Sequence, residues 1–298
     1  MPVIPALRPN SLAGVCRTGE PLHLKFIGLE NKSGEGGAVY TCLVRIAIAL
    51  LTGLLIVGCQ AAPRTEGPVA SSPVLPAVLV HLPGVAGPMA IDATLVSGLI
   101  DGGVADEAET FDWNAGRRGL PALNGYDENR REAGRLAARL TELFRADPRR
   151  RITVSGHSGG TAVAVWALEQ LPADVRIDRL VLLASALSPA YDLSPALTHV
   201  REEAVSFYSP FDREVLGLGT KLLGTMDRQY TPAAGYAGFT PPPGAAGAYA
   251  KLKQVAYDAE WKRYGHYGDH IGMMESAFAA SVIAPLVVPA ARPPGGHR

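Results

Sequence analysis

Apolar and polar residues alternate in blocks along residues 76–288 of this 298-residue chain. Several short blocks are continuously apolar, as expected for strands buried on both faces, and longer blocks repeat at helical spacing. Strands are predicted at 77–82, 109–113, 151–155, 179–184, 204–208 and 252–257. Helices are predicted at 91–99, 128–144, 161–171 and 273–284. Because the strands alternate with helices, the pattern favours an α/β fold whose mostly parallel sheet carries helices on both faces.

The helix ends and one long connection carry further signals. Asp127 is predicted to be the N-cap of the helix at 128–144, since an Asp side chain can accept from the first free N–H groups. Pro285 is expected to end the last helix. Residues 220–247 are rich in Gly, Pro, Tyr and Ala and show no convincing periodicity. We interpret them as a lid or an irregular loop over a site.

Charge and size narrow the class of protein. The 28 Lys and Arg residues balance 28 Asp and Glu residues, so the net charge is zero. A balanced chain gives no reason to expect nucleic acid or another polyanion as a partner. The roughly 240 residues left after the N-terminal part are enough for one α/β domain.

The N-terminal part contains a short apolar run. Arg45 is followed by the apolar residues 46–58 and then by Cys59. A positive residue before a short apolar run is typical of a secretory signal. The run is shorter than the roughly 20 apolar residues that a membrane-spanning helix needs. We therefore expect an exported protein.

The end of this run, Ile56-Val57-Gly58-Cys59, resembles the bacterial lipoprotein box. The resemblance implies that residues 44–58 are a signal peptide and that Cys59 is lipidated and becomes the mature N-terminus. Residues 59–75 would then be a flexible tether that holds the protein on a membrane of the bacterial cell envelope. Gln60, in place of Asp, favours the outer membrane in a diderm cell. An ordinary signal peptide cut near Ala62, or an uncleaved anchor, is the alternative.

Residues 1–43 fit no signal peptide and lack periodicity, so we expect that the start codon was assigned too early. Initiation at Val44 would give an ordinary signal sequence. Cys16 and Cys42 precede the expected cut and leave Cys59 as the only cysteine of the mature chain, which excludes disulfides within it. At the other end, residues 289–298 are expected to be a disordered tail.

The motif richest in chemistry is Gly156-His157-Ser158-Gly159-Gly160, between a predicted strand and a predicted helix. A serine on such a sharp turn has a strained backbone, and glycines beside it let strand and helix approach closely. The turn exposes the hydroxyl above the helix N-terminus and predicts Ser158 as a nucleophile. His157 occupies the variable position and is expected to line the site. The alternative is a glycine-rich turn with an incidental serine.

With this turn, a later acid and a C-terminal histidine, residues 76–288 resemble the α/β-hydrolase family, in which the catalytic residues follow the order Ser, Asp or Glu, His. The resemblance implies Ser158 as nucleophile, Asp212 as acid and His270 as base. Asp212 closely follows a predicted strand, and His270 directly precedes the closing helix.

Other residues compete for two of these roles. His266 is the alternative base, and Asp192, then Asp227, are the alternative acids. The spacing of His266 and His270 also suits a metal ion on a helix, but Gly265, Gly268 and Gly272 argue against a helix there. No metal or organic cofactor is expected.

The resemblance also implies an oxyanion hole formed by the N–H of Gly159 and an N–H near Gly84 and Val85. The sequence His81-Leu-Pro-Gly84 resembles the family's His-Gly loop with Leu-Pro inserted. The expected function is hydrolysis of a small-molecule or lipid carboxylic ester through an acyl-enzyme. A non-catalytic envelope lipoprotein of the same fold, or an acyltransferase with the same residues, is the alternative.

Overall fold

The computed structural model describes residues 75–288, which form one sheet flanked by helices. All neighbouring strands pair in parallel, in the order β2-β1-β3-β4-β5-β6. The strands are β1 (Val78–Leu82), β2 (Glu107–Thr110), β3 (Ile152–His157), β4 (Ile177–Leu183), β5 (Val200–Tyr208) and β6 (Leu252–Ala256). The expected signal peptide, Cys59, most of the tether and the tail at 289–298 lie outside the described residues.

The longer helices lie between the strands in sequence, and short helical turns follow β5 and β6. The longer ones are α2 (Ala90–Asp101), α4 (Tyr126–Ala146) and α5 (Gly159–Leu168). The short α-helices are α3 (Leu120–Asn124), α6 (Ser194–Leu197), α7 (Thr220–Leu223), α8 (Ala234–Ala237), α9 (Ala246–Tyr249), α10 (Ser276–Phe278) and α11 (Ala284–Val287). The 3₁₀ turns are η2 (Ala259–Tyr264) and η3 (Gly272–Met274), and the π-helical turns are η1 (Arg213–Gly219) and η4 (Ala279–Ile283).

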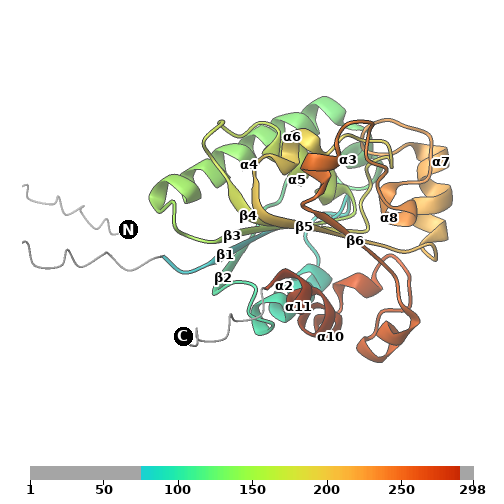
Figure 1. The fold of residues 1–298 in the computed structure, drawn as a ribbon. Coiled ribbons are helices and arrows are strands. Elements are labelled where there is room, and N and C mark those ends of the chain that lie inside the picture. Colours follow the sequence, from blue (N-terminus) through green and yellow to red (C-terminus); the bar gives the residue numbers. More distant parts are fainter. Residues whose placement is uncertain (1–74, 289–298) are drawn as a thin grey trace, which may run out of the picture. The chain divides into compact units, whose positions relative to one another are not determined.

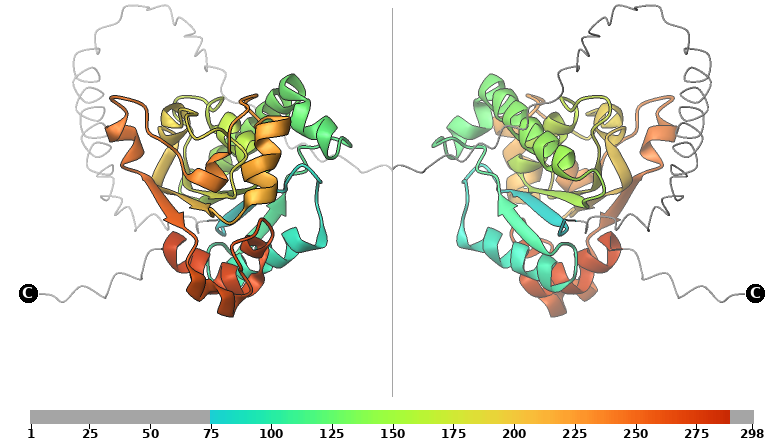
Figure 2. Two further views of the ribbon diagram at one scale, coloured as in Figure 1. Left: turned by 90° about the vertical axis from the view of Figure 1, so that its right-hand side faces the viewer. Right: turned by 90° about the vertical axis from the view of Figure 1, so that its left-hand side faces the viewer.

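The helices form a layer on each face of the sheet (Figures 1 and 2). Helices α4, α5 and α6 cover one face, and α2 lies with α10 and α11 on the other. Because both faces are covered, the central strands β3 and β4 are buried at every position. The edge strand β2, with the sequence EAET, is mostly exposed. The prediction of an α/β-hydrolase fold with helices on both faces of a parallel sheet is confirmed.

Helix α5 differs from the other helices in having no polar face. All ten of its residues are buried, because α5 lies between β3 on one side and α4 on the other. The ring of Trp166 on α5 packs edge-on against Tyr126 at the start of α4, with 5.3 Å between ring centroids. Only Ser158 separates the end of β3 from Gly159, so the N-terminus of α5 lies at the end of β3.

Several sequence-based boundaries were wrong for local reasons. Helix α4 begins at Tyr126 with Gly125 as its N-cap, so Asp127 lies inside the first turn, where a carboxylate is still favourable to the helix dipole. Strand β2 is Glu107–Thr110 rather than 109–113. Pro285 does not end the last helical segment, which continues to Val287; it sits in the first turn of α11, where its missing N–H costs little.

The stretch 220–247 is not a single irregular loop. It contains α7 and α8 and the start of α9, each only four residues long. Elements this short do not produce a detectable helical repeat in sequence. Within residues 75–288, no helix combines the length and the apolarity that crossing a membrane would require.

Candidate active site

Ser158 occupies the sharp turn between β3 and α5. Its backbone has φ 52° and ψ −122°, a left-handed conformation that an L-residue adopts only under strain. Its N–H donates to the carbonyl oxygen of Leu183 on the neighbouring strand β4 at 2.9 Å. Two glycines make the turn possible: a Cβ on Gly156 would lie 2.8 Å from Thr161 N, and one on Gly160 would overlap the carbonyl oxygens of Leu82 and Pro83.

The loop after β1 lies against this turn. A Cβ added to Gly84 would be 3.4 Å from Ser158 Cβ, and one added to Gly159 would be 2.7 Å from Val85 Cγ1. Gly159 is the first residue of α5, so its N–H has no acceptor within the helix. Across residues 75–288, nothing accepts from the N–H groups of Gly84, Val85 and Gly159. Three free N–H groups therefore lie on residues adjoining Ser158.

Two side chains from the segment after β2 hold the same loop. The indole Nε1 of Trp113, which is fully buried, donates to the carbonyl oxygen of Pro83 at 2.7 Å. The side-chain amide of Asn114 donates to the carbonyl oxygen of Val85 at 3.0 Å. These two hydrogen bonds hold the carbonyl groups of Pro83 and Val85. Because each peptide unit is planar, the N–H groups of the loop keep a fixed direction as well.

A buried polar network lies behind the loop, and sequence reasoning did not identify it. His81 Nε2 donates to Asp92 Oδ1 at 3.0 Å, and His81 Nδ1 accepts from Ser155 Oγ at 2.9 Å. The other oxygen of Asp92 accepts from Met89 N at 2.8 Å and caps α2. This network connects β1, β3 and α2 on both sides of the loop. The available signal was a histidine at the end of a buried strand, followed by an aspartate in the first turn of the next helix.

The expected acid and base are hydrogen-bonded to each other. His270 Nδ1 lies 2.6 Å from Asp212 Oδ2, and the Asp212 side chain is almost fully buried. The second oxygen, Oδ1, accepts from Leu216 N at 3.4 Å, so Asp212 also caps η1. A carboxylate oxygen accepts hydrogen bonds, so this contact favours the His270 tautomer with the proton on Nδ1, in which Nε2 is an acceptor.

Two contacts hold the loops that carry this pair. Ser209, just after β5, donates from Oγ to the carbonyl oxygen of Gly268 at 2.6 Å. Asp269 Oδ1 accepts from the N–H groups of Ile271 and Gly272, at 3.0 and 2.8 Å, and closes the turn after His270. The loop after β5 and the loop before the closing helices are therefore joined.

Ser158 and His270 do not form a hydrogen bond in this state of the described chain. They are linked through His157, whose Nε2 lies 3.0 Å from the carbonyl oxygen of His270. Ser158 lies in a cavity of about 340 Å³, and His270 lines an adjacent one of about 390 Å³. Glu214 and Val215 line both, so the two cavities meet at η1. Catalytic hydrogen bonds are often long in free enzymes and shorten when substrate binds.

The cavity around Ser158 is mainly apolar. Its polar contributors are few, and one wall is formed by η1 and α7. Beside Ser158, its lining includes Val85, Leu120, Leu123, Ala186, Val215, Leu216 and Leu223. Three residues of η1 and α7, namely Leu218, Leu222 and Leu223, expose half or more of their surface. A cavity with this lining can accommodate an apolar group beside the Ser158 hydroxyl.

His266, the alternative base, is enclosed by aromatic rings. It is fully buried, and its ring centroid lies 4.7 Å from that of Phe278 and 4.9 Å from that of Tyr257. Its Nδ1 accepts from Gly268 N, and its Nε2 has no hydrogen-bond partner in the part of the chain that the structure describes. Burial lowers the pKa of His266 to about 4. Within residues 75–288, no cluster of three or more His, Cys, Asp or Glu side chains could hold a metal ion.

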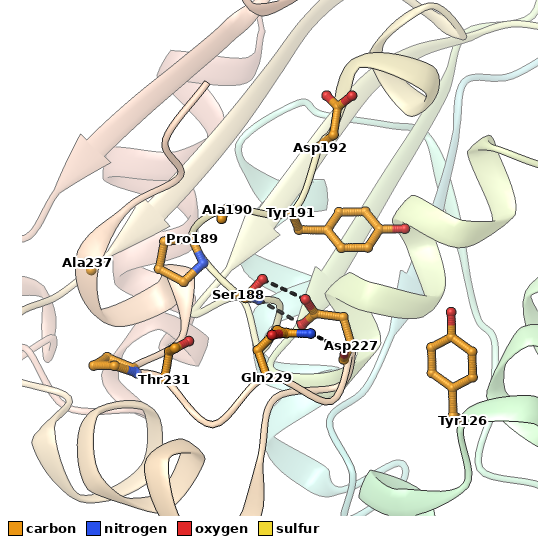
Figure 3. Close-up of a pocket in the computed structure, with 11 residues that line it drawn as sticks. Tyr126, Ser188, Pro189, Ala190, Tyr191, Asp192, Asp227, Gln229, Thr231 and Ala237 are labelled. Carbon is orange, nitrogen blue, oxygen red and sulfur yellow. Dashed lines mark hydrogen bonds between the residues drawn. The ribbon is translucent and has the colours of Figure 1, made fainter. Parts of the chain in front are cut away.

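The alternative acids lie around a different cavity, of about 630 Å³, whose lining includes neither Ser158 nor His270 (Figure 3). Asp227 accepts from the N–H and the hydroxyl of Ser188, at 2.8 and 2.5 Å. Asp192 is exposed, and its Oδ1 accepts from Ser194 N at 2.8 Å. Among residues 75–288, neither carboxylate forms a hydrogen bond with a histidine, whereas Asp212 does.

Comparisons with known proteins give structural similarity only. No protein-family model matches the chain, and no curated protein matches it. An acetylxylan esterase is 15% identical, with 70% of this chain and 96% of the esterase covered and a TM-score of 0.39. An esterase domain of a Rhodothermus marinus protein is 16% identical over 74% and 88% of the two chains, with a TM-score of 0.39. A cutinase-like protein from Cryptococcus sp. is 14% identical over 72% and 93%, with a TM-score of 0.34.

Proposed function

We propose that the protein is a serine hydrolase that cleaves carboxylic esters with an apolar acyl group. The observation that carries the proposal is the Asp212–His270 hydrogen bond close to a strained serine at a helix N-terminus. A buried carboxylate bound to the Nδ1–H of a histidine leaves Nε2 free to accept a proton from a serine. The backbone strain at Ser158 supports the same conclusion, because such strain is concentrated at functional sites.

Each residue has a defined role in the reaction. Ser158 Oγ attacks the ester carbonyl while His270 Nε2 takes its proton, and the carbonyl oxygen becomes an oxyanion bound by the N–H groups of Val85 and Gly159. The tetrahedral intermediate collapses, the C–O bond to the alcohol breaks, and His270 protonates the leaving alkoxide. Water, activated by His270, then releases the acid from the acyl-enzyme. Asp212 stabilises the imidazolium at both stages.

The cavity indicates the class of substrate. An acyl chain attached to the reacting carbonyl would lie among the leucine and valine side chains beside Ser158. We further propose that a lipidated Cys59 holds the domain on the bacterial envelope, within reach of lipidic esters. This second proposal rests on the sequence alone. Its test is metabolic labelling of the protein with a fatty-acid analogue. The wild-type protein should be labelled, and Cys59→Ala should not. A wild-type protein that is secreted without the label would contradict this proposal.

A fluorophosphonate probe and a series of p-nitrophenyl esters test the function. The wild-type protein should be labelled on Ser158 and should hydrolyse the esters. Absence of both would indicate the non-catalytic alternative. Transfer to an added alcohol in preference to water would indicate an acyltransferase, because that reaction uses the same residues.

A further inference from the structure

His157 makes a contact with the His270 loop that sequence reasoning did not identify. His157 is the last residue of β3, directly before Ser158, and its ring is almost completely buried. Its Nε2 lies 3.0 Å from the main-chain carbonyl oxygen of His270. A carbonyl oxygen only accepts hydrogen bonds, so Nε2 of His157 must carry the proton. The contact therefore fixes the tautomer of this histidine.

The ring of His157 is also held in its neutral form. Burial, and next the charge of neighbouring His270, lower the pKa of His157 to about 3. A neutral donor can hold the His270 loop without repelling a positive charge on the His270 ring. A lysine or arginine donor at this position would oppose formation of an imidazolium.

The same ring touches the second loop of the site. The ring centroids of His157 and His270 are 4.8 Å apart. On another side, a Cβ added to Gly84 would lie 3.5 Å from His157 Nδ1. The side chain of His157 thus lies next to both the loop that carries His270 and the loop that carries the free N–H groups of Gly84 and Val85. Since His157 and Ser158 are consecutive, movement of this ring is coupled to the nucleophile.

We propose that His157 is a positioning residue: its Nε2–H holds the main chain of His270 so that the His270 ring can reach both Asp212 and Ser158. The inference rests on the proposed function, because it assigns His270 the role of base. His157 touches no substrate in this role and acts through the loop that it binds. His270 lies on a turn and not within a regular element. Its main chain is therefore held by individual hydrogen bonds, those of Ser209 and Asp269 on neighbouring residues and that of His157 on His270 itself.

Three substitutions of His157 separate hydrogen bonding from simple packing. His157→Gln can place an amide N–H near the position of Nε2, whereas the shorter His157→Asn cannot reach it, and His157→Leu has no donor. The measurements are kcat and KM for a p-nitrophenyl ester, the rate of fluorophosphonate labelling, and the Tm. We expect His157→Leu and His157→Asn to lower kcat by about 10- to 100-fold with KM little changed, because a misplaced catalytic group costs rate rather than binding. His157→Gln should recover most of kcat.

Equal kcat for the Gln and Asn variants, or wild-type kcat in the Leu variant, would overturn the proposal. If the Leu variant fails to fold, the Gln and Asn pair still decides. A wild-type protein that neither reacts with the probe nor cleaves esters would refute the proposed function instead. In that case the NMR resonance of the His270 Nδ1 proton is the readout. It should change in His157→Asn and return in His157→Gln, and an identical resonance in both variants would refute the positioning role.

Discussion

Asp212 and His270 are 58 residues apart in sequence, yet 2.6 Å separates their interacting side-chain atoms. The two oxygens of Asp212 are divided between two partners, His270 Nδ1 and the N–H of Leu216. The carboxylate therefore cannot rotate without losing one of them. This explains how a residue on a loop can hold an imidazole in one orientation.

Asp212→Asn should keep the fold and lower kcat by about 10²- to 10⁴-fold, because an amide no longer favours the Nδ1–H tautomer of His270. The matched control is Asp192→Asn, since Asp192 is exposed and lines a separate cavity. Steady-state kinetics on a p-nitrophenyl ester measure both variants. A silent Asp212→Asn together with a crippled Asp192→Asn would reassign the acid.

Ser158→Ala should abolish fluorophosphonate labelling and lower turnover by about 10⁴-fold or more. Circular dichroism should show an unchanged fold, because the substitution removes only the hydroxyl. Mass spectrometry of the labelled wild-type protein identifies the modified residue. Labelling that persists in Ser158→Ala would place the nucleophile elsewhere.

His270→Ala should be about as damaging to turnover as Ser158→Ala, because residues of such a site act as a unit. His266→Ala should instead lower the free energy of unfolding by roughly 2–4 kcal/mol, since it leaves a hole among Tyr257, Phe278 and neighbouring rings. Denaturant unfolding and kcat, measured on both variants, separate the two effects. The reverse pattern would make His266 the base.

Stability should fall as the pH falls below about 6.5. Burial lowers the pKa of His266 from 6.5 to about 4 and that of His157 to about 3, so both are neutral in the fold at neutral pH. Between those values and 6.5 the unfolded chain binds more protons, and the free energy of unfolding therefore decreases with decreasing pH. For His266 the loss can reach about 3 kcal/mol near pH 4. Denaturant unfolding at a series of pH values measures this dependence. The free energy of unfolding of His266→Phe should change less with pH than that of the wild type. An unchanged pH dependence would refute the neutral burial of His266.

Ala186→Leu should reduce hydrolysis of long-chain esters more than that of acetate. Ala186 is buried beside Ser158 and lines its cavity, so a larger side chain would occupy space for the acyl group. Ala190→Leu is the matched control, because Ala190 lines the separate cavity near Asp227. The measurement is the ratio of kcat/KM for long and short esters. An equal ratio in both variants would exclude this cavity as the acyl site.

The fold and the turn at Ser158 could be predicted because they depend on local rules. Continuously apolar strands require a sheet that is covered on both faces, and glycines beside a serine permit a strained turn. From sequence, only the position of His270 directly before the closing helix favours it over His266, since both lie among glycines. What distinguishes them is burial by Trp261, Tyr257 and Phe278, which come together only in the tertiary structure.

Other features escaped prediction because their partners are distant or their elements are short. The contact of His157 with the His270 carbonyl spans 113 residues, and nothing in the local sequence indicates it. The helices α7 and α8 have four residues each, too few to show a repeat. Pro285, expected to end the last helix, instead lies near the start of a short helical segment. A new helical segment begins at Ala284, just before this proline, and the first turn of a helix accepts proline.

The left-handed backbone of Ser158 lowers the stability of the fold at the residue that the proposed reaction requires. Holding a serine at φ 52° costs about 1–3 kcal/mol that a glycine at the same position would not incur. A selection for heat resistance alone would therefore favour replacing Ser158 with glycine, and with it the loss of the hydroxyl. Retention of serine at this position in thermostable variants would itself be a record of selection for turnover.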